Sequence, residues 1–357
     1  MDRKTYKKNR KNKRIRKRMM LIGVPLFLLI ASGLVYGGYL YTKAQNVAND
    51  SFEEVEGREQ SNLREKEVDP DIDNVSVLFL GVDGSESREN ASGFENGTTR
   101  TDAIILATLN NDDKSVKLTS IPRDTLAYIP EVGREDKINH AHAFGGPKAS
   151  MEAVEELLNV PVDYYVRMNF YAFMDVVDAL GGVEVDVPFD MTEMNSEDKK
   201  NAIILNEGTQ TVNGEEALAF VRSRYQDSDI ARGGRQQEVI EAILTKSKSV
   251  GSINKYADVI DAVGDNMKTN MRFSEMRSFI TYAANSDLNV DSQTLQGEGV
   301  YYNNIYYYEA YADQLAEVQS DLREHLDLPL AAQESESSGF SSEADSSEDL
   351  YDEENNW

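Results

Sequence analysis

The sequence of 357 residues has no cysteine. This absence excludes disulfides, thiolate zinc sites, iron–sulfur clusters and cysteine nucleophiles. Two common motifs are missing as well, namely the G-x-x-x-x-G-K-[ST] loop and the G-x-S-x-G elbow. Nucleotide hydrolysis on such a loop and acyl transfer by a serine on such an elbow are therefore unsupported.

Positive charge is scarce over most of the chain. Residues 1–18 hold eleven Lys and Arg against one acid, whereas the remaining residues hold 26 basic and 62 acidic side chains. A body this acidic is poorly suited to nucleic acid, which is bound by clustered cations that release counterions. We therefore expect no nucleic-acid partner, and we interpret residues 1–18 as an orientation and anionic-lipid signal.

Long apolar runs are also rare, with one exception. Residues 19–42 carry no charge, and a helix of that length measures about 36 Å, enough to cross a hydrocarbon core of ~30 Å. The run is longer than the ~7–15 residue core of a signal peptide, and no A-x-A cleavage site follows it. The positive-inside bias places residues 1–18 in the cytoplasm. The prediction is a single-pass protein of the cell membrane with an extracellular C-terminal domain.

The rest of the chain divides by composition into three parts. Residues 43–72 are charged and weakly periodic, and they are predicted to be an extracellular stalk. Residues 331–357 contain nine acids, seven serines and no base, which predicts a disordered acidic tail. Residues 73–330 between them are predicted to form one extracellular domain with a helical C-terminal part.

Within this domain, β-rich runs alternate with helical periodicity. The predicted strands are residues 75–82, 103–110, 116–122, 163–170 and 183–188, and the predicted helices are residues 149–159, 172–181 and 236–248. The helix at 236 is expected to follow a Gly-Gly turn, and residues 254–285 and 308–326 are expected to be mainly helical. The alternation predicts an α/β fold whose sheet is covered by helices on both faces.

Two aspartates stand beside predicted strands. Asp83 follows the first strand, and Asp102 directly precedes the second. Loops at the carboxyl ends of strands bind ligands in open α/β sheets, and one or two carboxylates with substrate phosphate suit Mg²⁺. The two aspartates are therefore candidate metal ligands, although each of them alone also fits an ordinary turn or helix cap.

Four arginines, Arg222, Arg224, Arg232 and Arg235, fall within fourteen residues of this acidic domain. Arg222 and Arg224 point to the same side if the segment is extended, and Arg232 and Gln236 share a face if a helix has begun. Guanidinium forks bind phosphate oxygens in bidentate fashion and keep their charge, which suits a diphosphate. The alternative is that these arginines form surface ion pairs with the many acids.

Two shorter motifs are informative in different ways. The sequence Ser-Ile-Pro-Arg-Asp ends the third predicted strand and adds Arg123 as a candidate site residue. His140 and His142 have the H-x-H spacing of a metal site, but no third ligand is apparent. We therefore predict no zinc site.

Taken together, six segments resemble the LytR-CpsA-Psr family of Gram-positive cell-wall glycopolymer transferases. The segments are VLFLGVDG, RTDAIILATLN, SIPRDT, KINHAHAFGG, GGVEVDVP and ALAFVRSRYQDSDIARGGRQQ, and the resemblance covers roughly residues 75–247. The resemblance implies a mixed central sheet sandwiched by helices. It also implies a Mg²⁺-dependent phosphotransferase that moves a glycopolymer, of the wall teichoic acid or capsule type, from a polyprenyl diphosphate carrier to peptidoglycan.

The resemblance also assigns expected site residues by position. Asp83 and Asp102 match the acids that hold Mg²⁺ or another divalent cation. The expected diphosphate ligands are Arg100, Arg123, Arg222, Arg224, Arg232 and Gln236. The expected catalytic residues are Asp102, Arg123 and Asp229, and either aspartate is a candidate base for the acceptor hydroxyl. Lys137 lies in a further matching motif.

The lipid tail of such a carrier needs an apolar groove, for which the predicted helices 149–159 and 172–181 are candidate walls. Residues 84–99 form a long loop that is a candidate lid over the substrate. Two other functions fit the same residues. A diphosphate-lipid hydrolase would use water as the acceptor, and a non-catalytic membrane-bound regulator would bind the polymer without turnover.

Overall fold

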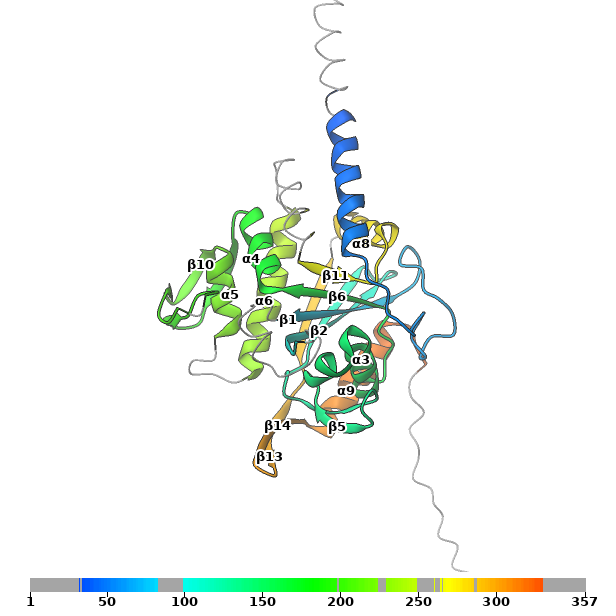
Figure 1. Ribbon diagram of the computed structural model, residues 1–357, viewed down its shortest axis with the longest axis vertical. Helices are drawn as coiled ribbons and strands as arrows, with labels where there is room; N and C mark the ends of the chain where they lie inside the picture. Colours follow the sequence, from blue (N-terminus) through cyan, green and yellow to red (C-terminus); the bar gives the residue numbers. More distant parts are fainter. Residues whose placement is uncertain are drawn as a thin grey trace, which may run out of the picture.

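The computed structural model describes residues 32, 34–82, 99–197, 199–223, 229–248, 260, 264, 266–285 and 288–329. A helix over residues 34–51 leads into a domain built on a mixed central sheet with helices on both faces (Figure 1). The predicted α/β fold is confirmed. Across these described ranges, no helix is long and apolar enough to cross a membrane. Most of the predicted span, residues 19–42, lies outside them.

Six strands form the central sheet, in the order β11 (Met267–Thr269), β6 (Tyr164–Asn169), β1 (Val75–Val82), β2 (Thr101–Asn110), β3 (Ser115–Ser120) and β12 (Asn289–Thr294). The neighbours β1 and β2 are antiparallel, as are β2 and β3. By contrast, β6 is parallel to β1 and β12 is parallel to β3. Four of these six strands, β1, β2, β3 and β6, were predicted from the sequence pattern.

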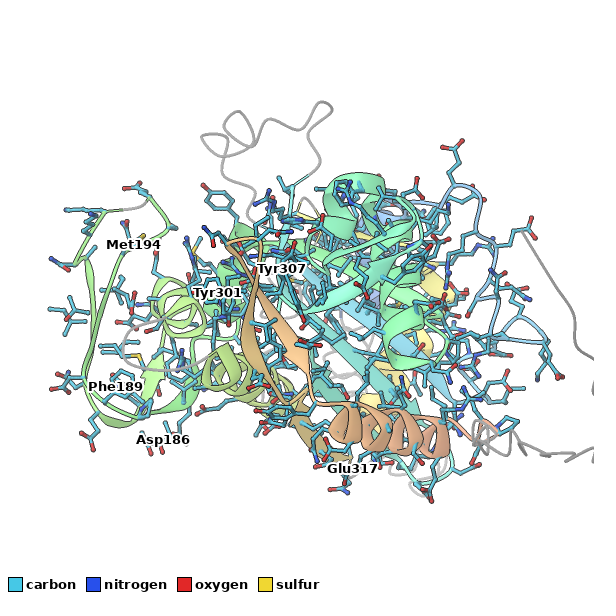
Figure 2. The ribbon with its side chains drawn as sticks, turned by 90° about the horizontal axis from the view of Figure 1, so that it is seen from below. Asp186, Phe189, Met194, Tyr301, Tyr307 and Glu317 are labelled. Carbon is cyan, nitrogen blue, oxygen red and sulfur yellow. The ribbon has the colours of Figure 1, made fainter. Side chains whose placement is uncertain are left out.

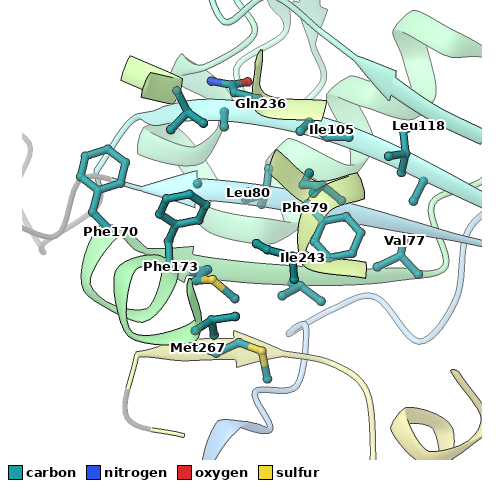
Figure 3. A pocket seen from close by; sticks show the side chains of 18 of the residues that line it. Val77, Phe79, Leu80, Ile105, Leu118, Phe170, Phe173, Gln236, Ile243 and Met267 are labelled. Atoms are coloured by element: carbon teal, nitrogen blue, oxygen red, sulfur yellow. The ribbon is translucent and has the colours of Figure 1, made fainter. Parts of the chain in front are cut away.

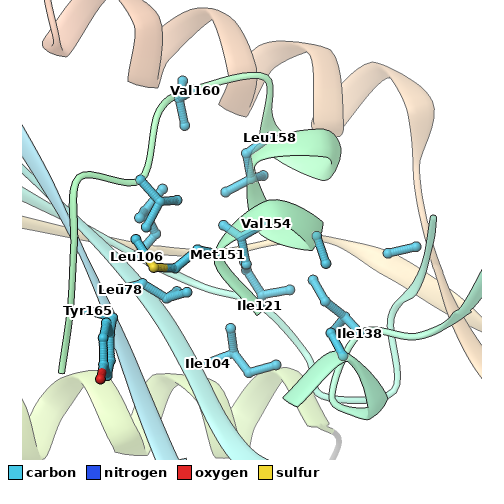
Figure 4. Packing of buried hydrophobic residues seen from close by; sticks show 14 of the residues in the cluster. Leu78, Ile104, Leu106, Ile121, Ile138, Met151, Val154, Leu158, Val160 and Tyr165 are labelled. Atoms are coloured by element: carbon cyan, nitrogen blue, oxygen red, sulfur yellow. The ribbon is translucent and has the colours of Figure 1, made fainter. Parts of the chain in front are cut away.

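One face of this sheet is densely packed. Leu78 and Leu80 of β1 and Leu106 of β2 point to it, and each is at most 1% exposed. The helices α3 (His140–Leu158) and α9 (Ala312–His325) cover this face and complete a continuous apolar core (Figure 4). Burial of this kind contributes roughly 25 cal/mol per Å² of apolar surface removed from water, so this face is the main source of stability.

The opposite face carries the alternate side chains of the same strands, because successive residues of a strand point to opposite sides. Val77 and Phe79 of β1, Ile105 of β2 and Leu118 of β3 belong to it. The helices α6 (Asp229–Lys248) and α8 (Phe273–Asn285) lie over this face. We call the first face the packed face and the second the open face.

A smaller lobe lies beside the open face (Figure 1). Its elements share one apolar core and are α4 (Phe170–Ala179), β7 (Val183–Val187), β8 (Met191–Glu193), β9 (Ile203–Leu205), β10 (Gly208–Val212) and α5 (Gly214–Arg222). As predicted, α4 ends before Gly181 and Gly182, whose φ angles of +80° and +86° lie in the left-handed region that glycine tolerates. A capping box at Asn213 starts α5.

Two hairpins complete the described elements. The first pairs β4 (Leu126–Ile129) with β5 (Arg134–Lys137), and the second pairs β13 (Gly297–Tyr302) with β14 (Ile305–Ala310). The β13–β14 hairpin projects on the side of the molecule opposite the N-terminal helix (Figure 1). The expectation of a mainly helical segment over residues 308–326 is correct for α9, but residues 308–310 end a strand.

The segment expected to be a free stalk, residues 43–72, is instead attached to the domain. Arg58 donates to both carboxylate oxygens of Glu155 in α3, at 2.9 and 2.7 Å, and the two side chains are only 5% and 9% exposed. Arg64 pairs with Asp163 at 2.7 Å, and Val55 joins the core of the packed face. The stalk prediction is therefore wrong here, because two arginines and an apolar side chain of the segment contact the domain.

Candidate active site at the mouth of an apolar cavity

A cavity of about 930 Å³ lies between the open face of the sheet and the helices α4, α6 and α8. Phe79, Ile105 and Leu118 rise from the sheet into it, and Phe173 and Ile243 reach it from α4 and α6 (Figure 3). Most of the remaining lining is aliphatic or aromatic too. Binding sites of this size and composition bury most of an apolar ligand.

The cavity runs along the strands and has one charged end. The lining of β2 extends from Asp102 to Leu109, which at ~3.4 Å per residue is about 24 Å. The charged and amide side chains of the lining gather near the Asp102 end and are Asp102, Arg123, Asn169, Glu193, Arg222, Arg232 and Gln236. Near the other end, Tyr282 of α8 closes the cavity by donating to the carbonyl oxygen of Asn110 at 2.7 Å. The lining thus changes from charged to apolar along one axis.

Arg123 is held in place from two sides. It follows β3, and its Nη1 donates to Asp102 on the neighbouring strand β2. Its Nε lies 3.7 Å from Asp124, and Lys137 of β5 binds the other oxygen of Asp124 at 3.0 Å. The Arg123 side chain is 22% exposed, and its buried Nε makes no hydrogen bond to a described residue. The guanidinium is therefore oriented by carboxylates while part of it faces the cavity.

Arg222 lies across the mouth from Arg123. It is the last residue of α5, so the prediction of an extended segment here is wrong, because the capped helix continues through it. Its guanidinium lies over the ring of Phe170 at 4.9 Å, a cation–π contact that helps to orient the side chain. Phe170 begins α4, so two helices of the small lobe meet at the mouth.

Helix α6 supplies Arg232 and Gln236, which share a face as predicted. The helix begins at Asp229, so Gly233 and Gly234 lie inside it, and the predicted Gly-Gly turn is wrong. Gly233 explains the pattern physically, because a Cβ at this position would lie 2.9 Å from the Ser120 hydroxyl of β3. The glycine lets α6 approach the sheet and carry Arg232 to the mouth.

Arg235 has a structural role and does not line the cavity. It is 5% exposed, and its guanidinium donates to the carbonyl oxygens of Phe220 at 3.0 Å and Ser223 at 2.7 Å. These carbonyls belong to the C-terminal end of α5, where helices leave acceptors unsatisfied. Arg235 therefore joins α6 to the end of α5 that carries Arg222.

The remaining predicted residues have different outcomes. Asp83, Arg224 and the side chain of Asp229 lie outside the described residues, as does most of the loop 84–99. Arg100 directly precedes β2 and is exposed, but it does not line the cavity. Lys137 touches the site indirectly, through Asp124.

Of the two predicted metal ligands, Asp83 and Asp102, the described residues include Asp102. No group of three or more His, Asp or Glu side chains suited to a metal occurs among them. Mg²⁺ usually keeps several waters and is held by one or two carboxylates with substrate phosphates, so a single carboxylate at a phosphate-binding mouth fits it. The Asp102 side chain is 32% exposed and has an oxygen beyond the one that Arg123 uses.

Both histidines of the H-x-H pair have partners within the protein. Nδ1 of His140 lies 2.9 Å from Asp136, and Nδ1 of His142 lies 2.6 Å from the carbonyl oxygen of Thr99. Burial lowers the pKa of His142 to about 4, and it also lowers the pKa of His140. His142 is therefore neutral at pH 7 and donates to the carbonyl of Thr99.

The apolar walls of the cavity were predicted only in part. Of the two helices proposed as walls, residues 172–181 correspond to α4, which does line the cavity, whereas α3 lies on the packed face and does not. The walls from the sheet and from α6 were missed. Their apolar spacing matches that of a solid core, so the sequence holds no signal that separates the two cases.

The fold and the cavity define an α/β protein whose site fits an apolar chain with a polyanionic head group. Comparison with known proteins identifies the family. The LytR_cpsA_psr family matches residues 38–324, and the chain belongs to this family. The resemblance found in the six sequence segments is thereby confirmed.

Two relatives illustrate the match in sequence. The polyisoprenyl-teichoic acid–peptidoglycan teichoic acid transferase TagT of Bacillus subtilis is 39% identical over 91% of this chain and 99% of its own length. The transferase of the same kind called TagU in Halalkalibacterium halodurans is 35% identical over 88% of this chain and 100% of its own length.

Solved structures of related proteins resemble this chain in fold, and two of them contain bound ligands. A structure of TagT bound to LI-WTA has a TM-score of 0.66 and 39% identity, and it covers 77% of this chain and 100% of its own. A structure of YwtF (TagT) with bound octaprenyl pyrophosphate lipid has a TM-score of 0.62 and 36% identity, with coverage of 77% and 100%.

Proposed function

We propose that this protein is a phosphotransferase that moves a glycopolymer of the wall teichoic acid or capsule type from a polyprenyl diphosphate carrier to peptidoglycan. The observation that carries the proposal is the apolar cavity of about 930 Å³ with arginines at one end. An isoprenoid tail needs a long apolar channel, and a diphosphate needs fixed cations. The names of the related transferases and their bound lipids support the same conclusion.

The donor binds with its tail between the sheet and α6, and with its diphosphate at the mouth. Arg123, Arg222 and Arg232 approach this point from β3, α5 and α6, and Gln236 adds an amide donor. Arginines on three separate elements surround an anion better than a cluster on one loop, and each keeps its charge at any physiological pH. The chain thus neutralises the charge of the diphosphate in a largely apolar environment, where such interactions are strong.

The reaction breaks the bond between the sugar-bound phosphorus and the bridging oxygen of the diphosphate. A hydroxyl oxygen of peptidoglycan bonds to that phosphorus, its proton passes to a base, and polyprenyl phosphate leaves. Catalysis of this kind depends on positioning and on stabilisation of developing charge. Arg123 is suited to this task because Asp102 and Asp124 orient it before the donor arrives. Asp102 and Asp229 remain the two candidate bases.

Mg²⁺ or another divalent cation is part of the proposal. Asp102 would hold it, together with Asp83, which lies outside the described residues. When bound, the cation would supply additional positive charge to the diphosphate oxygens. The carboxylate of Asp102 would then orient Arg123 and bind the cation through different oxygens.

The proposal places the protein in the cell membrane, with residues 19–42 as the single span, residues 1–18 in the cytoplasm and the domain outside. Tyr39 and Tyr41 support an interfacial position for the outer end of this span, because their side chains are 54% and 51% exposed. Tyrosines are enriched at the membrane surface. A donor whose tail is embedded in the bilayer would then reach the cavity without leaving the membrane surface.

The test uses the full-length protein in phospholipid vesicles with Mg²⁺, a lipid-linked glycan and peptidoglycan. The expected product is a covalent glycan–peptidoglycan conjugate. Arg123→Ala should lower its rate by about 10²–10³-fold, the usual cost of removing an oriented charge-stabilising donor. Arg134→Ala is the matched control, since Arg134 lies in the nearby β5 with a side chain that is 62% exposed, and the rate should not change.

Other outcomes identify the alternative functions. Free phosphorylated glycan without conjugate would show a diphosphate-lipid hydrolase. Binding of the lipid-linked glycan that Arg123→Ala weakens, with no product of either kind, would show a non-catalytic binding protein. Full activity after removal of divalent cations with a chelator would contradict the proposed cation requirement, whereas the proposed transferase function would stand.

A further inference from the structure

The β13–β14 hairpin exposes an unusual number of aromatic rings. Tyr301 is 72% exposed and Tyr302 is 47% exposed, beside Ile305 at 50%. The rings are ordered by stacking, because Tyr301 meets Tyr306 edge to face at 5.5 Å and Tyr302 meets Tyr307 at 6.0 Å. Figure 2 shows Tyr301 and Tyr307 on this hairpin, viewed from the side to which it projects. Exposed apolar surface of this kind commonly marks an interaction site.

The hairpin is continuous with the proposed active site. The amide of Tyr308 in β14 donates to the carbonyl oxygen of Asp124 at 2.9 Å. Lys137, which binds the Asp124 carboxylate at 3.0 Å, also lies over the rings of Tyr306 and Tyr307 at 5.7 and 5.8 Å. The base of the hairpin is therefore built from residues that contact the neighbour of Arg123.

The position and charge of the hairpin select among partners. It projects away from the N-terminal helix, and thus away from the proposed membrane (Figure 1). The segment 297–311 has the sequence GEGVYYNNIYYYEAY, with two glutamates and no basic residue. A polymer rich in phosphate groups would be repelled by Glu298 and Glu309, whereas a sugar chain without phosphate would not.

We propose that the β13–β14 hairpin binds the glycan strand of the acceptor and brings one of its hydroxyls to the diphosphate. This inference rests on the proposed transferase function and names the binding surface for its second substrate. Each tyrosine ring offers an apolar face to the C–H face of a sugar and a hydroxyl at its edge for hydrogen bonding. The Tyr302 hydroxyl already donates to Glu309 at 2.8 Å, which orients both groups.

The geometry gives the two substrates separate approaches. The lipid tail of the donor occupies the cavity on the open face, between the sheet and the helices α6 and α8, whereas the hairpin does not line this cavity and adjoins Arg123 through Asp124 and Lys137. The two substrates therefore meet at the arginines without crossing. This arrangement permits binding of a long acceptor strand, of which only a short stretch has to enter the mouth.

The first experiment measures binding of the full-length protein, in detergent, to purified peptidoglycan sacculi from which attached polymers have been removed. The double variant Tyr301→Ala, Tyr302→Ala should bind about tenfold more weakly, because the apolar faces of two exposed rings are removed. The variant Tyr301→Phe, Tyr302→Phe keeps the rings and should retain most of the binding. Ile204→Ala in β9 is the matched control, since Ile204 is 66% exposed on a different hairpin and binding should be unchanged.

The second experiment compares kinetics in the transfer assay. The Ala variant should raise the KM for peptidoglycan about tenfold and leave the KM for the lipid-linked glycan unchanged. Unchanged sacculus binding by a variant with a wild-type circular dichroism spectrum would overturn the inference. So would a loss confined to binding of the lipid-linked glycan, because the hairpin would then serve the donor. If the wild-type protein transfers nothing, the proposed function fails, while the sacculus assay still decides whether the hairpin binds glycan.

Discussion

The packed face and the open face of the central sheet are built from the same strands but have different interiors. Leu106 of β2 points into a filled core under α3 and α9, and the preceding residue, Ile105, points into a cavity of about 930 Å³. The difference comes from how the covering helices rest on the sheet. Small residues of α3, such as Ala149 and Ala153, are fully buried in the packed core.

On the open face, α6 meets the sheet at its β3–β12 edge, through Gly233 against Ser120 and Thr294. Helix α8 packs near the other strands, with Met276 and Phe279 beside β1 and β6. Between these two contacts the helices do not fill the space above the middle of the sheet, and the cavity lies there. A protein interior is normally as dense as an organic crystal, so an open space of this size needs a structural reason. Here α6 and α8 contact the sheet on either side of the cavity and hold it open.

The largest expected effect is a difference in stability between substitutions at two adjacent residues of β2, Ile105 and Leu106. Leu106→Ala should lower the free energy of unfolding by about 2–5 kcal/mol, because a filled core loses contacts and gains a void. Ile105→Ala should cost only about 1–2 kcal/mol, because its side chain already borders empty space and has fewer contacts to lose. Urea unfolding followed by circular dichroism measures both. Equal losses would show that the two faces are packed alike.

The next largest effect is a pH dependence of the free energy of unfolding, which we expect from His142 in α3. Burial lowers the pKa of His142 to about 4 from an ordinary value of 6.5. Between these two pH values, the histidine is protonated in the unfolded chain and neutral in the folded protein. Stability should be complete above pH 6.5 and decrease by about 3 kcal/mol as the pH falls to 4.

Unfolding free energies measured between pH 4 and 7 test this expectation. His142→Gln should flatten the dependence by one proton, and an unchanged slope would contradict the assignment. Donor binding at the open face should vary less over the same range, because its arginines do not titrate there.

The smallest expected effect is a difference in stability between alanine substitutions at two neighbouring glycines of α6, Gly233 and Gly234. Gly234→Ala should stabilise the protein by up to about 1 kcal/mol, because alanine favours the helix and a Cβ there meets nothing within 4 Å. Gly233→Ala should be less stable than Gly234→Ala by about 1–3 kcal/mol, because its Cβ would lie 2.9 Å from the Ser120 hydroxyl. Thermal unfolding compares the two, and equal melting temperatures would mean that α6 does not need this close approach to β3.

Much of the fold was predictable because its signals are local. The runs that became β1, β2 and β3, and the glycines that end α4, depend on side-chain alternation and on φ preferences that each segment carries by itself. The stalk prediction failed because the charges of Arg58 and Arg64 have partners about a hundred positions away. The Gly-Gly turn failed because Gly233 serves packing against β3 instead of a reversal of the chain.

The sequence by itself determined the uncharged run over residues 19–42, the acidic body, the alternation of strands and helices, and the clustering of arginines. Only the tertiary structure decided which apolar residues surround a cavity, that Arg235 supports α5 while Arg232 faces the mouth, and that the tyrosine hairpin adjoins Asp124. The physical reason is that residue type and spacing fix chemistry and periodicity, whereas a cavity depends on the distance between elements, which is set by long-range contacts such as that of Gly233 with Ser120.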